Sequence, residues 1–309
     1  MLSRRDLGKI TLAGLPSLLH GAVKAEVRVG ASTDSFHDFP RRPGRDNTDE
    51  IIRALTAAGV TEIDLASGNT EAPSPDTGLP PPPPPGPYGG PPAGFTPAEL
   101  AARTRALREN LRKWRLATPA SHYAELKTRF DRSGISVYAL SFQHDDAFTD
   151  EEIDATFGHA QALGAEVIAS RASLAMAKRL APFAERHAMT VAFRNENETA
   201  AQISALAAVS PRFRVNLDIG NFTAANQECV AYIQENYRRI THLMVKDRTR
   251  QGGGNETFGS GDTPIQDVLR LVRDKQYPIR AYVDYEYVGL GTPEEEVRKC
   301  LAYIRAALA

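Results

Sequence analysis

The stretch RVNLDIGNF, residues 214–222, alternates apolar and polar side chains up to Asp218. The stretches TVAFRNE (190–196), ITHLMVKD (240–247) and RAYVDYE (280–286) repeat this alternation. Side chains two apart along a strand point to the same face of a sheet. We therefore predict four strands, each with one apolar face and one polar face.

Strand-length apolar runs alternate with helical patterns along most of the chain. The expected strands are Val27–Ala31, Glu62–Leu65, Ile135–Phe142, Glu166–Ala169, Thr190–Arg194, Arg214–Asp218, Ile240–Val245 and Arg280–Glu286. The expected helices are Asp49–Ala58, Thr96–Trp114, Thr118–Arg132, Asp150–Leu163, Leu174–His187, Glu198–Ala208, Asn226–Tyr237, Ile265–Lys275 and Glu294–Leu308. Alternation of this kind requires a parallel sheet, and eight units match a closed barrel. We predict one α/β domain, a (β/α)8 TIM barrel over residues 26–309, and not a doubly wound sheet, because no glycine-rich dinucleotide turn follows the first strand.

Residues 68–95 interrupt this rhythm with a proline-rich insertion that contains the run Pro80–Pro85. Such a composition favours an extended polyproline loop and cannot build a core. Loops after barrel strands lie on the catalytic face. The insertion is therefore either an unstructured decoration or a segment that overhangs the pocket.

Residues 1–25 resemble a twin-arginine signal peptide. SRRDLGK (3–9) precedes an apolar stretch at 10–19 and the ending VKA at 23–25. We expect export by the twin-arginine machinery to the periplasm, the alternative being a short amphipathic helix. Ten apolar-rich residues are too few for a stable membrane span.

Charge and cysteine content exclude several classes of partner. The 37 basic and 38 acidic residues give a net charge of −1, so we expect no nucleic-acid partner and favour a small neutral ligand. Cys229 and Cys300 lack metal-site or redox spacing, and we expect two buried apolar thiols. The sequence indicates no oligomeric state.

The polar faces of the last four expected strands hold most of the candidate chemistry. They comprise Arg194, Glu196, Asn216, Asp218, His242, Met244, Lys246, Asp284 and Glu286. In a barrel this face points inward, and residues at the strand ends line the mouth. Burying carboxylates beside Arg and Lys is costly unless they pair or hold a ligand. We predict a functional pocket, with a self-satisfied ion-pair network as the alternative.

Several motifs carry a family resemblance. FRNEN (193–197), LDIGNF (217–222), VKDR (245–248) and YEY (285–287) resemble strand-end motifs of xylose isomerase-like barrels, the sugar phosphate isomerase/epimerase type. FGSGDTP (258–264) resembles the glycine-rich loop after the seventh strand of those proteins. The resemblance spans about residues 27–309 around the insertion. It implies a carbohydrate substrate and an isomerase or epimerase that abstracts a proton next to a sugar carbonyl.

The resemblance also implies one divalent cation, Mn²⁺, Mg²⁺ or Co²⁺, held by two Glu, one Asp and one His. Asp218 stands at the Asp position, but Arg194 and Met244 stand where a Glu and the His are expected. The candidate metal ligands are therefore Asp218, Glu196 and Glu286, with absence of a metal as the other possibility.

Without a metal, positive side chains must stabilise the developing negative charge. The candidate catalytic residues are Glu286, Asp284 and Lys246, and the candidate substrate-binding residues are Arg194, Asn195, His144 and Arg171. Two alternatives remain: a non-catalytic sugar-binding barrel with a decayed metal site, and a metal-independent lyase that acts on an oxidised sugar.

Overall fold

The computed structural model describes residues 26–39, 46–71 and 96–309. The predicted signal peptide at 1–25 lies outside the described residues, as do positions 72–95 of the predicted insertion. The first residues assigned to that insertion are part of the barrel, because α2 (Ser67–Thr70) follows the second strand directly and Glu71 is buried.

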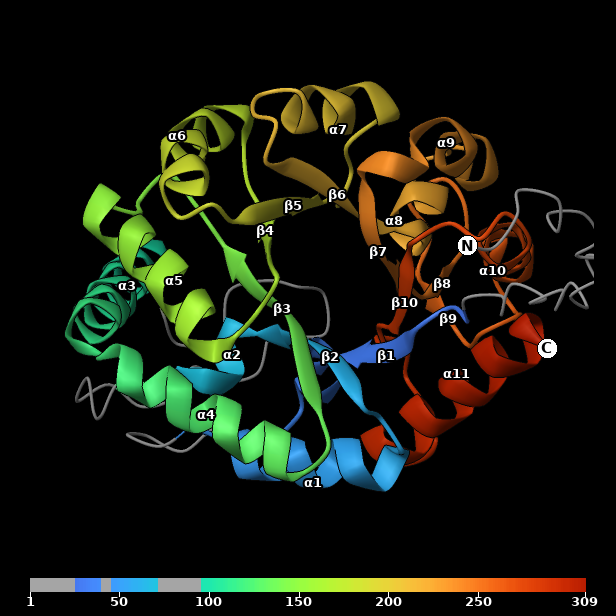
Figure 1. Ribbon diagram of the computed structural model, residues 1–309, viewed down its shortest axis with the longest axis horizontal. Coiled ribbons are helices and arrows are strands. Elements are labelled where there is room, and N and C mark those ends of the chain that lie inside the picture. The colour runs from blue at the N-terminus through green and yellow to red at the C-terminus, as the bar shows by residue number, and fades with distance from the viewer. Residues whose placement is uncertain (1–25, 40–45, 72–95) are drawn as a thin grey trace, which may run out of the picture.

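Eight parallel strands close into a barrel. They are β1 (Val29–Ser32), β2 (Glu62–Ala66), β3 (Ser136–Gln143), β4 (Val167–Arg171), β5 (Thr190–Arg194), β6 (Phe213–Asp218), β7 (Ile240–Val245) and β10 (Arg280–Val283). Their order around the barrel is β1-β10-β7-β6-β5-β4-β3-β2, closed by pairing of β1 with β2. Figure 1 looks into this barrel, with the helices arranged around it. The predicted TIM barrel is confirmed.

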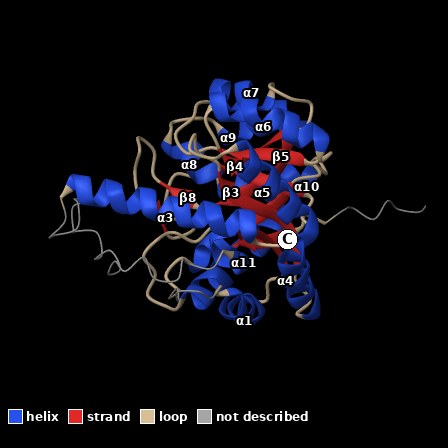
Figure 2. Ribbon diagram, turned by 90° about the vertical axis from the view of Figure 1, so that its left-hand side faces the viewer, coloured by secondary structure: helices blue, strands red, loops and turns tan. Residues whose placement is uncertain are grey.

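Helices cover the outside of the barrel. They are α1 (Thr48–Ala58), α3 (Pro97–Ala117), α4 (Ala120–Arg132), α5 (Asp150–Leu163), α6 (Leu174–Arg186), α7 (Ala200–Ala207), α8 (Ile219–Ala224), α9 (Cys229–Asn236), α10 (Ile265–Asp274) and α11 (Pro293–Leu308). Capping boxes at Thr96, Thr199 and Thr292 satisfy the first backbone donors of α3, α7 and α11. One end of α3 projects from the body at the left of Figure 2.

The connection after β6 differs from the prediction of one helix over Asn226–Tyr237. The chain forms α8 immediately and then α9, because the Asp218 carboxylate caps α8 by accepting a hydrogen bond from the Asn221 N–H. A short antiparallel pair, β8 (Asp247–Arg248) and β9 (Asn255–Glu256), also follows β7.

The predicted alternation separates two packing layers. The apolar face packs against the helices through Val191, Phe193, Val215, Leu217, Leu243, Val245, Val283 and Tyr285. A smaller apolar cluster fills the barrel interior with Tyr138, Ala139, Val167, Ala169, Ala192, Met244 and Tyr282. This plug leaves the strand ends above it to polar side chains.

The expectation for the two cysteines is confirmed: Cys229 and Cys300 are buried free thiols. Trp114, on α3, is partly buried and packs against the core. Within the described residues, no helix combines the length and apolarity required to cross a membrane.

Candidate active site at the barrel mouth

The carboxyl ends of four strands bring charged side chains together. Arg194 ends β5, Asp218 ends β6, Lys246 follows β7, and Asp284 and Glu286 follow β10. Asp218 and Asp284 are 0% exposed, and Arg194 and Lys246 are also buried. The predicted gathering of these residues at the mouth is what the structure shows.

Lys246 lies among three carboxylates. Its Nζ is 2.8 Å from Glu286 Oε2, 3.1 Å from Asp218 Oδ2 and 3.5 Å from Asp284 Oδ2. Three ammonium protons are thus directed at three acidic groups. The ammonium therefore holds the ends of β6 and β10 together.

Arg194 faces the same carboxylates from β5. Its Nε and Nη2 donate to Asp218 Oδ2 at 3.2 and 2.8 Å, and Nη2 also donates to Asp284 Oδ2. Asp34 and Glu286 lie 3.7 and 3.8 Å from the guanidinium nitrogens. We call these six residues the mouth cluster: Asp34, Arg194, Asp218, Lys246, Asp284 and Glu286. In it, carboxylates outnumber cations.

Because carboxylates are in excess, their pKa values shift in opposite directions: that of Asp284 is lowered, and those of Glu286 and Asp34 are raised. Burial favours the neutral form of Asp284, yet Arg194 and Lys246 hold its pKa at about 2. Burial and the neighbouring Asp284 charge raise the pKa of Glu286 despite Lys246. Partial burial and the same Asp284 charge raise the pKa of Asp34. The cluster therefore contains a permanent anion beside carboxyl groups that accept protons more readily.

Both cations keep their charge despite burial. The carboxylates Asp218 and Asp284 outweigh desolvation and raise the pKa of Lys246. The same neighbours raise that of Arg194. Lys246 is thus an ammonium donor at neutral pH and not a free amine base.

Asn195 has a different place from the one predicted. Its Oδ1 accepts a hydrogen bond from the Asp218 N–H at 2.8 Å, and its Nδ2 donates to the Asp218 carbonyl at 3.0 Å. Asn221 Nδ2 donates to the Asn195 carbonyl at 3.1 Å. Both side chains therefore fix the strand ends that carry Arg194 and Asp218, and both amide atoms of Asn195 are engaged with the Asp218 backbone.

His144 is also engaged within the protein. It is 1% exposed, and its ring nitrogens lie 2.9 Å from Ser170 Oγ and 3.3 Å from Thr156 Oγ1. Burial, followed by the charges of Arg115 and Arg108, lowers its pKa to about 3. His144 is thus a neutral ring held by two hydroxyl groups at the wall of the mouth cavity, and its role in substrate binding stays a prediction.

The predicted metal ligands do not come together. Glu196 is half exposed and pairs with Arg171 at 3.2 Å, while Asp218 and Glu286 face Lys246 and Arg194. Met244 lies in the interior plug. In the described ranges, no group of three or more His, Cys, Asp or Glu side chains is arranged to hold a metal ion. Asp284 Oδ1 has no hydrogen-bond partner among the described residues, but Arg194 and Lys246 both contact Oδ2 of Asp218 and of Asp284. The residues present therefore do not fit a divalent cation, because it would have to bind beside two buried positive charges that already use these carboxylates.

Two members of the site were missed in the sequence. Asp34 lies in the short helix η1 (Thr33–Phe36) after β1, and Asn255 in β9 donates to Glu286 Oε2 at 3.3 Å. An acidic residue just after the first strand was the available signal for Asp34. Asn255 belongs to the β8–β9 hairpin, whose sequence lacks the apolar-polar alternation that would have predicted strands there.

Two spaces open beside the cluster, on the side of β2 to β5. One of about 320 Å³ is lined by Asp34, Ser67, Glu71, Arg115 and others. The second, of about 420 Å³, extends past Glu196 and Glu198, and both share Gln143, Arg171 and Arg194 as walls. Spaces of this size suit a small ligand, so we name them together the mouth cavity.

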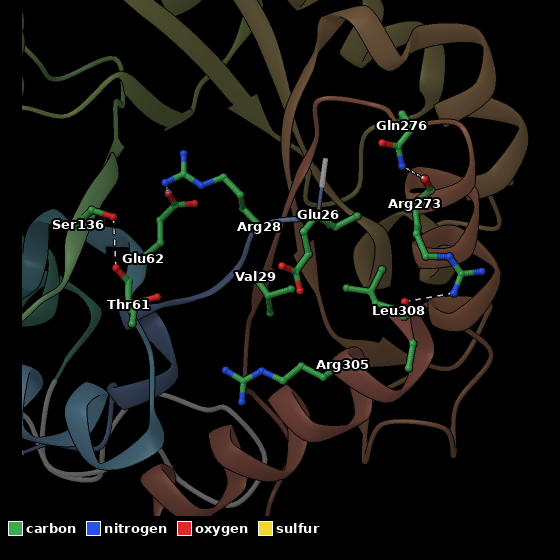
Figure 3. A pocket seen from close by; sticks show the side chains of 12 residues that line it. Glu26, Arg28, Val29, Thr61, Glu62, Ser136, Arg273, Gln276, Arg305 and Leu308 are labelled. Carbon is green, nitrogen blue, oxygen red and sulfur yellow. Dashed lines mark hydrogen bonds and ion pairs between the residues drawn. The ribbon is translucent and has the colours of Figure 1, made fainter. Parts of the chain in front are cut away.

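A larger cavity of about 770 Å³ lies at the opposite end of the barrel (Figure 3). It is lined by the starts of β1, β2 and β3 and by the end of α11. Arg28 pairs with Glu62 at 2.6 Å, and Arg273 donates to the Leu308 carbonyl at 3.2 Å. Active sites of TIM barrels lie at the carboxyl ends of the strands. Position, and not size, thus favours the mouth cavity.

Known proteins share this architecture. A sugar phosphate isomerase/epimerase from Parabacteroides distasonis is 14% identical, with a TM-score of 0.56 over 91% of this chain and 94% of its own. An L-ribulose 3-epimerase is 13% identical (TM-score 0.59, coverage 91% and 94%), and a D-psicose 3-epimerase crystallised with D-fructose is 12% identical (TM-score 0.58, coverage 91% and 99%). At these identities the likeness concerns the fold.

Sequence comparison gives the family. No curated protein matches the chain. The model of the xylose isomerase-like TIM barrel family matches residues 93–307, which include every mouth-cluster residue except Asp34. The chain therefore belongs to the xylose isomerase-like TIM barrel family.

Proposed function

We propose that this protein is a carbohydrate isomerase or epimerase that moves a proton next to a sugar carbonyl without a divalent metal. One observation carries the proposal: Lys246 and Arg194 hold fixed positive charge beside Glu286, a carboxyl group whose pKa is raised. The mouth cavity reaches this cluster at Asp34 and Arg194. A perturbed acid beside fixed cations, next to a cavity, is typical of a proton-transfer site.

The electrophilic role falls to the two cations. As the ionised Glu286 takes up the substrate proton and loses its charge, its contact with Lys246 weakens. The Lys246 ammonium, together with the Arg194 guanidinium, then stabilises the enolate oxygen that develops beside it, without reorganisation of solvent. Both groups are buried, which strengthens their electrostatic effect. Asp218 and Asp284 hold these cations in position through the contacts of 2.8 to 3.5 Å described above.

The proton-transfer role falls to Glu286. Its side chain is 29% exposed, whereas Asp284 is fully buried. The raised pKa makes it a stronger base once ionised and a usable acid once protonated. The low pKa of Asp284 makes that residue a permanent counter-charge and a poor base.

We further propose that residues 1–25 direct export through the twin-arginine pathway to the periplasm. The motif SRRDLGK followed by an apolar stretch supports this proposal. Replacing Arg4 and Arg5 by Lys should retain the protein in the cytoplasm, as measured by fractionation. Unchanged export would contradict the proposal.

Turnover of free and oxidised sugars by chelator-treated protein tests the proposed activity. Wild-type protein should convert a keto-sugar, and adding Mn²⁺ should change the rate less than twofold. Lys246→Met should lower kcat by about a hundredfold or more, the usual effect of removing a charge-stabilising donor. Lys275→Met, at an exposed site at the end of α10, is the matched control and should behave as wild type.

Binding of sugars without turnover would support the sugar-binding barrel instead. Full activity only after addition of a metal would overturn the metal-independent assignment. Elimination of water from an oxidised sugar, without isomerisation, would assign the protein as a lyase.

A further inference from the structure

The glycine-rich loop after β7 surrounds one carboxylate of the protein. Asp247 Oδ2 accepts hydrogen bonds from the Gly259 and Gly261 N–H groups at 2.7 and 3.1 Å, and Oδ1 accepts one from Thr263 N–H at 3.1 Å. Asp247 is 1% exposed. Three backbone donors thus converge on one buried anion.

The fit is close on the glycine side. A Cβ atom on Gly261 would lie 2.4 Å from Asp247 Oδ1, and Gly259 has a φ of +89°. Thr263 Oγ1 further fastens the loop by accepting a hydrogen bond from the Arg248 N–H at 3.0 Å. The loop is therefore closed around Asp247 and not poised for a second anion.

Successive backbone N–H groups form concave sites for anions, and TIM barrels commonly bind substrate phosphate with the loops after the seventh and eighth strands. In this protein the corresponding donors are already paired with Asp247. A phosphate would have to displace a buried carboxylate that accepts three hydrogen bonds.

Cations around the mouth cavity are paired as well. Arg171 contacts Glu196, and Arg115 contacts both Glu71 and Glu152. Arg194 and Lys246 share the carboxylates of the mouth cluster. An anionic ligand would therefore compete with existing ion pairs in a region where acids are in excess.

Arg248 is held by neutral acceptors. Its Nη1 donates to Asn221 Oδ1 at 2.8 Å, and its Nε and Nη2 donate to the Gly253 carbonyl at 3.1 and 2.6 Å. These contacts tie the guanidinium to Asn221 on α8 and to the Gly253 carbonyl.

Together these observations define the substrate class: we propose that the site takes a neutral sugar and discriminates against phosphate esters and sugar acids. This proposal rests on the carbohydrate function proposed above. The half-exposed Asp34 carboxylate, with its side chain 42% exposed on the mouth cavity, supplies an acceptor for sugar hydroxyls. Such an acceptor attracts hydroxyl donors and repels a phosphate or carboxylate.

Calorimetry with three matched ligands tests the proposal: a free keto-hexose, its 6-phosphate and the corresponding sugar acid. The free sugar should bind at least tenfold more tightly than either anion. Inorganic phosphate at roughly 20 mM, a concentration high enough to detect a weak anion site, should not compete with the sugar. Tighter binding of the phosphate ester, or competition by inorganic phosphate, would overturn the proposal.

Turnover assays on the same ligands separate this proposal from the proposed function. Isomerisation of the phosphate ester in preference to the free sugar would retain the isomerase and refute neutral selectivity. Selective binding of the free sugar without conversion would retain neutral selectivity and refute the isomerase.

The Asp247 loop provides a second test that needs no sugar. Asp247→Ala should free the three N–H donors and gain binding of inorganic phosphate, measured by calorimetry, whereas wild type and Asp247→Asn should show none. If Asp247→Ala does not fold, wild type alone still decides, because measurable binding of inorganic phosphate by the wild-type protein would overturn the proposal.

Discussion

Two buried ionic networks lie side by side in this barrel, and only one has the properties of an active site. The mouth cluster joins β5, β6, β7 and β10. The second, which we call the α3 network, consists of Arg108 and Arg115 on α3, Glu71 after α2, and Glu152 on α5. Both are mostly buried, with some partly exposed members in each, and both use short contacts, so burial alone does not distinguish them.

The balance of charge distinguishes them. In the α3 network, two guanidinium groups meet two buried carboxylates in forked geometry, with Arg115 to Glu71 at 2.6 and 3.0 Å and Arg108 to Glu152 at 2.7 Å twice. The pKa of Glu152 is lowered, because these donors outweigh its burial. In the mouth cluster the acids are in excess, and the pKa of Glu286 is raised instead.

This contrast indicates what each network does. A balanced, bidentate network fastens α3 and the end of β2 to α5, and it favours the ionised form of Glu152. An unbalanced network leaves one carboxyl group with a proton affinity useful for chemistry, at some cost in stability.

The largest expected effect is on catalysis and comes from Glu286→Gln. Turnover should fall by about a thousandfold, because an amide cannot exchange the proton. Since the folded state raises the pKa of Glu286, ionisation of this residue disfavours folding once the pH exceeds its unfolded value. The variant should therefore be as stable as wild type or more stable at pH 7 to 8 in urea unfolding. Glu235→Gln, at an exposed position on α9, is the control.

Reduced stability of Glu286→Gln with normal turnover would assign the mouth cluster to structure and remove the contrast.

Arg115→Met should have the opposite signature. It leaves Glu71 without its bidentate partner, which typically costs about 3 to 5 kcal/mol in unfolding free energy. The folded fraction should keep kcat within about threefold of wild type, since Arg115 contacts no mouth-cluster residue, although KM should rise because Arg115 lines the mouth cavity. Arg179→Met, which removes a surface pair with Asp150 at 2.7 Å, should cost less than about 1 kcal/mol.

Equal stability losses in Arg115→Met and Arg179→Met would show that the α3 network does not fasten α3.

A smaller effect, confined to acid, is expected at His144 beside the α3 network. The folded protein holds its pKa at about 3, against 6.5 for an ordinary histidine. Only the unfolded state takes up this proton between these values, so the stability contribution is complete above about pH 6.5 and is lost as the pH falls toward 3. Between pH 7.5 and pH 4.5, the unfolding free energy of wild type should therefore fall by about 2 to 3 kcal/mol more than that of His144→Gln.

Urea unfolding at the two pH values measures this difference, with the exposed His37→Gln variant as control. Parallel losses in wild type and His144→Gln would contradict the buried neutral state of His144.

Much of the fold and of the site follows from periodicity. The bounds of β5 and β7 are those expected from the sequence. Alternate positions of a strand share one face, and the polar positions of the last strands give Arg194, Asp218, Lys246 and Asp284 directly. The alternation of side chains predicts these positions because each strand is hydrogen-bonded on both sides, which fixes the register and hence the face of every side chain.

The alternation no longer predicts the direction of a side chain once the strand has ended. Glu196 was expected beside Arg194, but β5 stops at Arg194 and the Glu196 N–H turns to the Glu198 carboxylate at 2.6 Å. Asp284 also follows the end of its strand, yet its N–H still donates to the Val245 carbonyl at 3.0 Å, which keeps that segment in line with the mouth. A single sequence does not reveal which extension remains bonded to its neighbour.

Deuterium incorporation from D₂O into a neutral keto-sugar tests the central claim most directly. With chelator-treated wild-type protein, we predict incorporation of one deuterium at the carbon next to the carbonyl, followed by NMR, and no enzyme-dependent incorporation with Glu286→Gln. Incorporation that requires added Mn²⁺, or that continues unchanged in Glu286→Gln, would contradict the account.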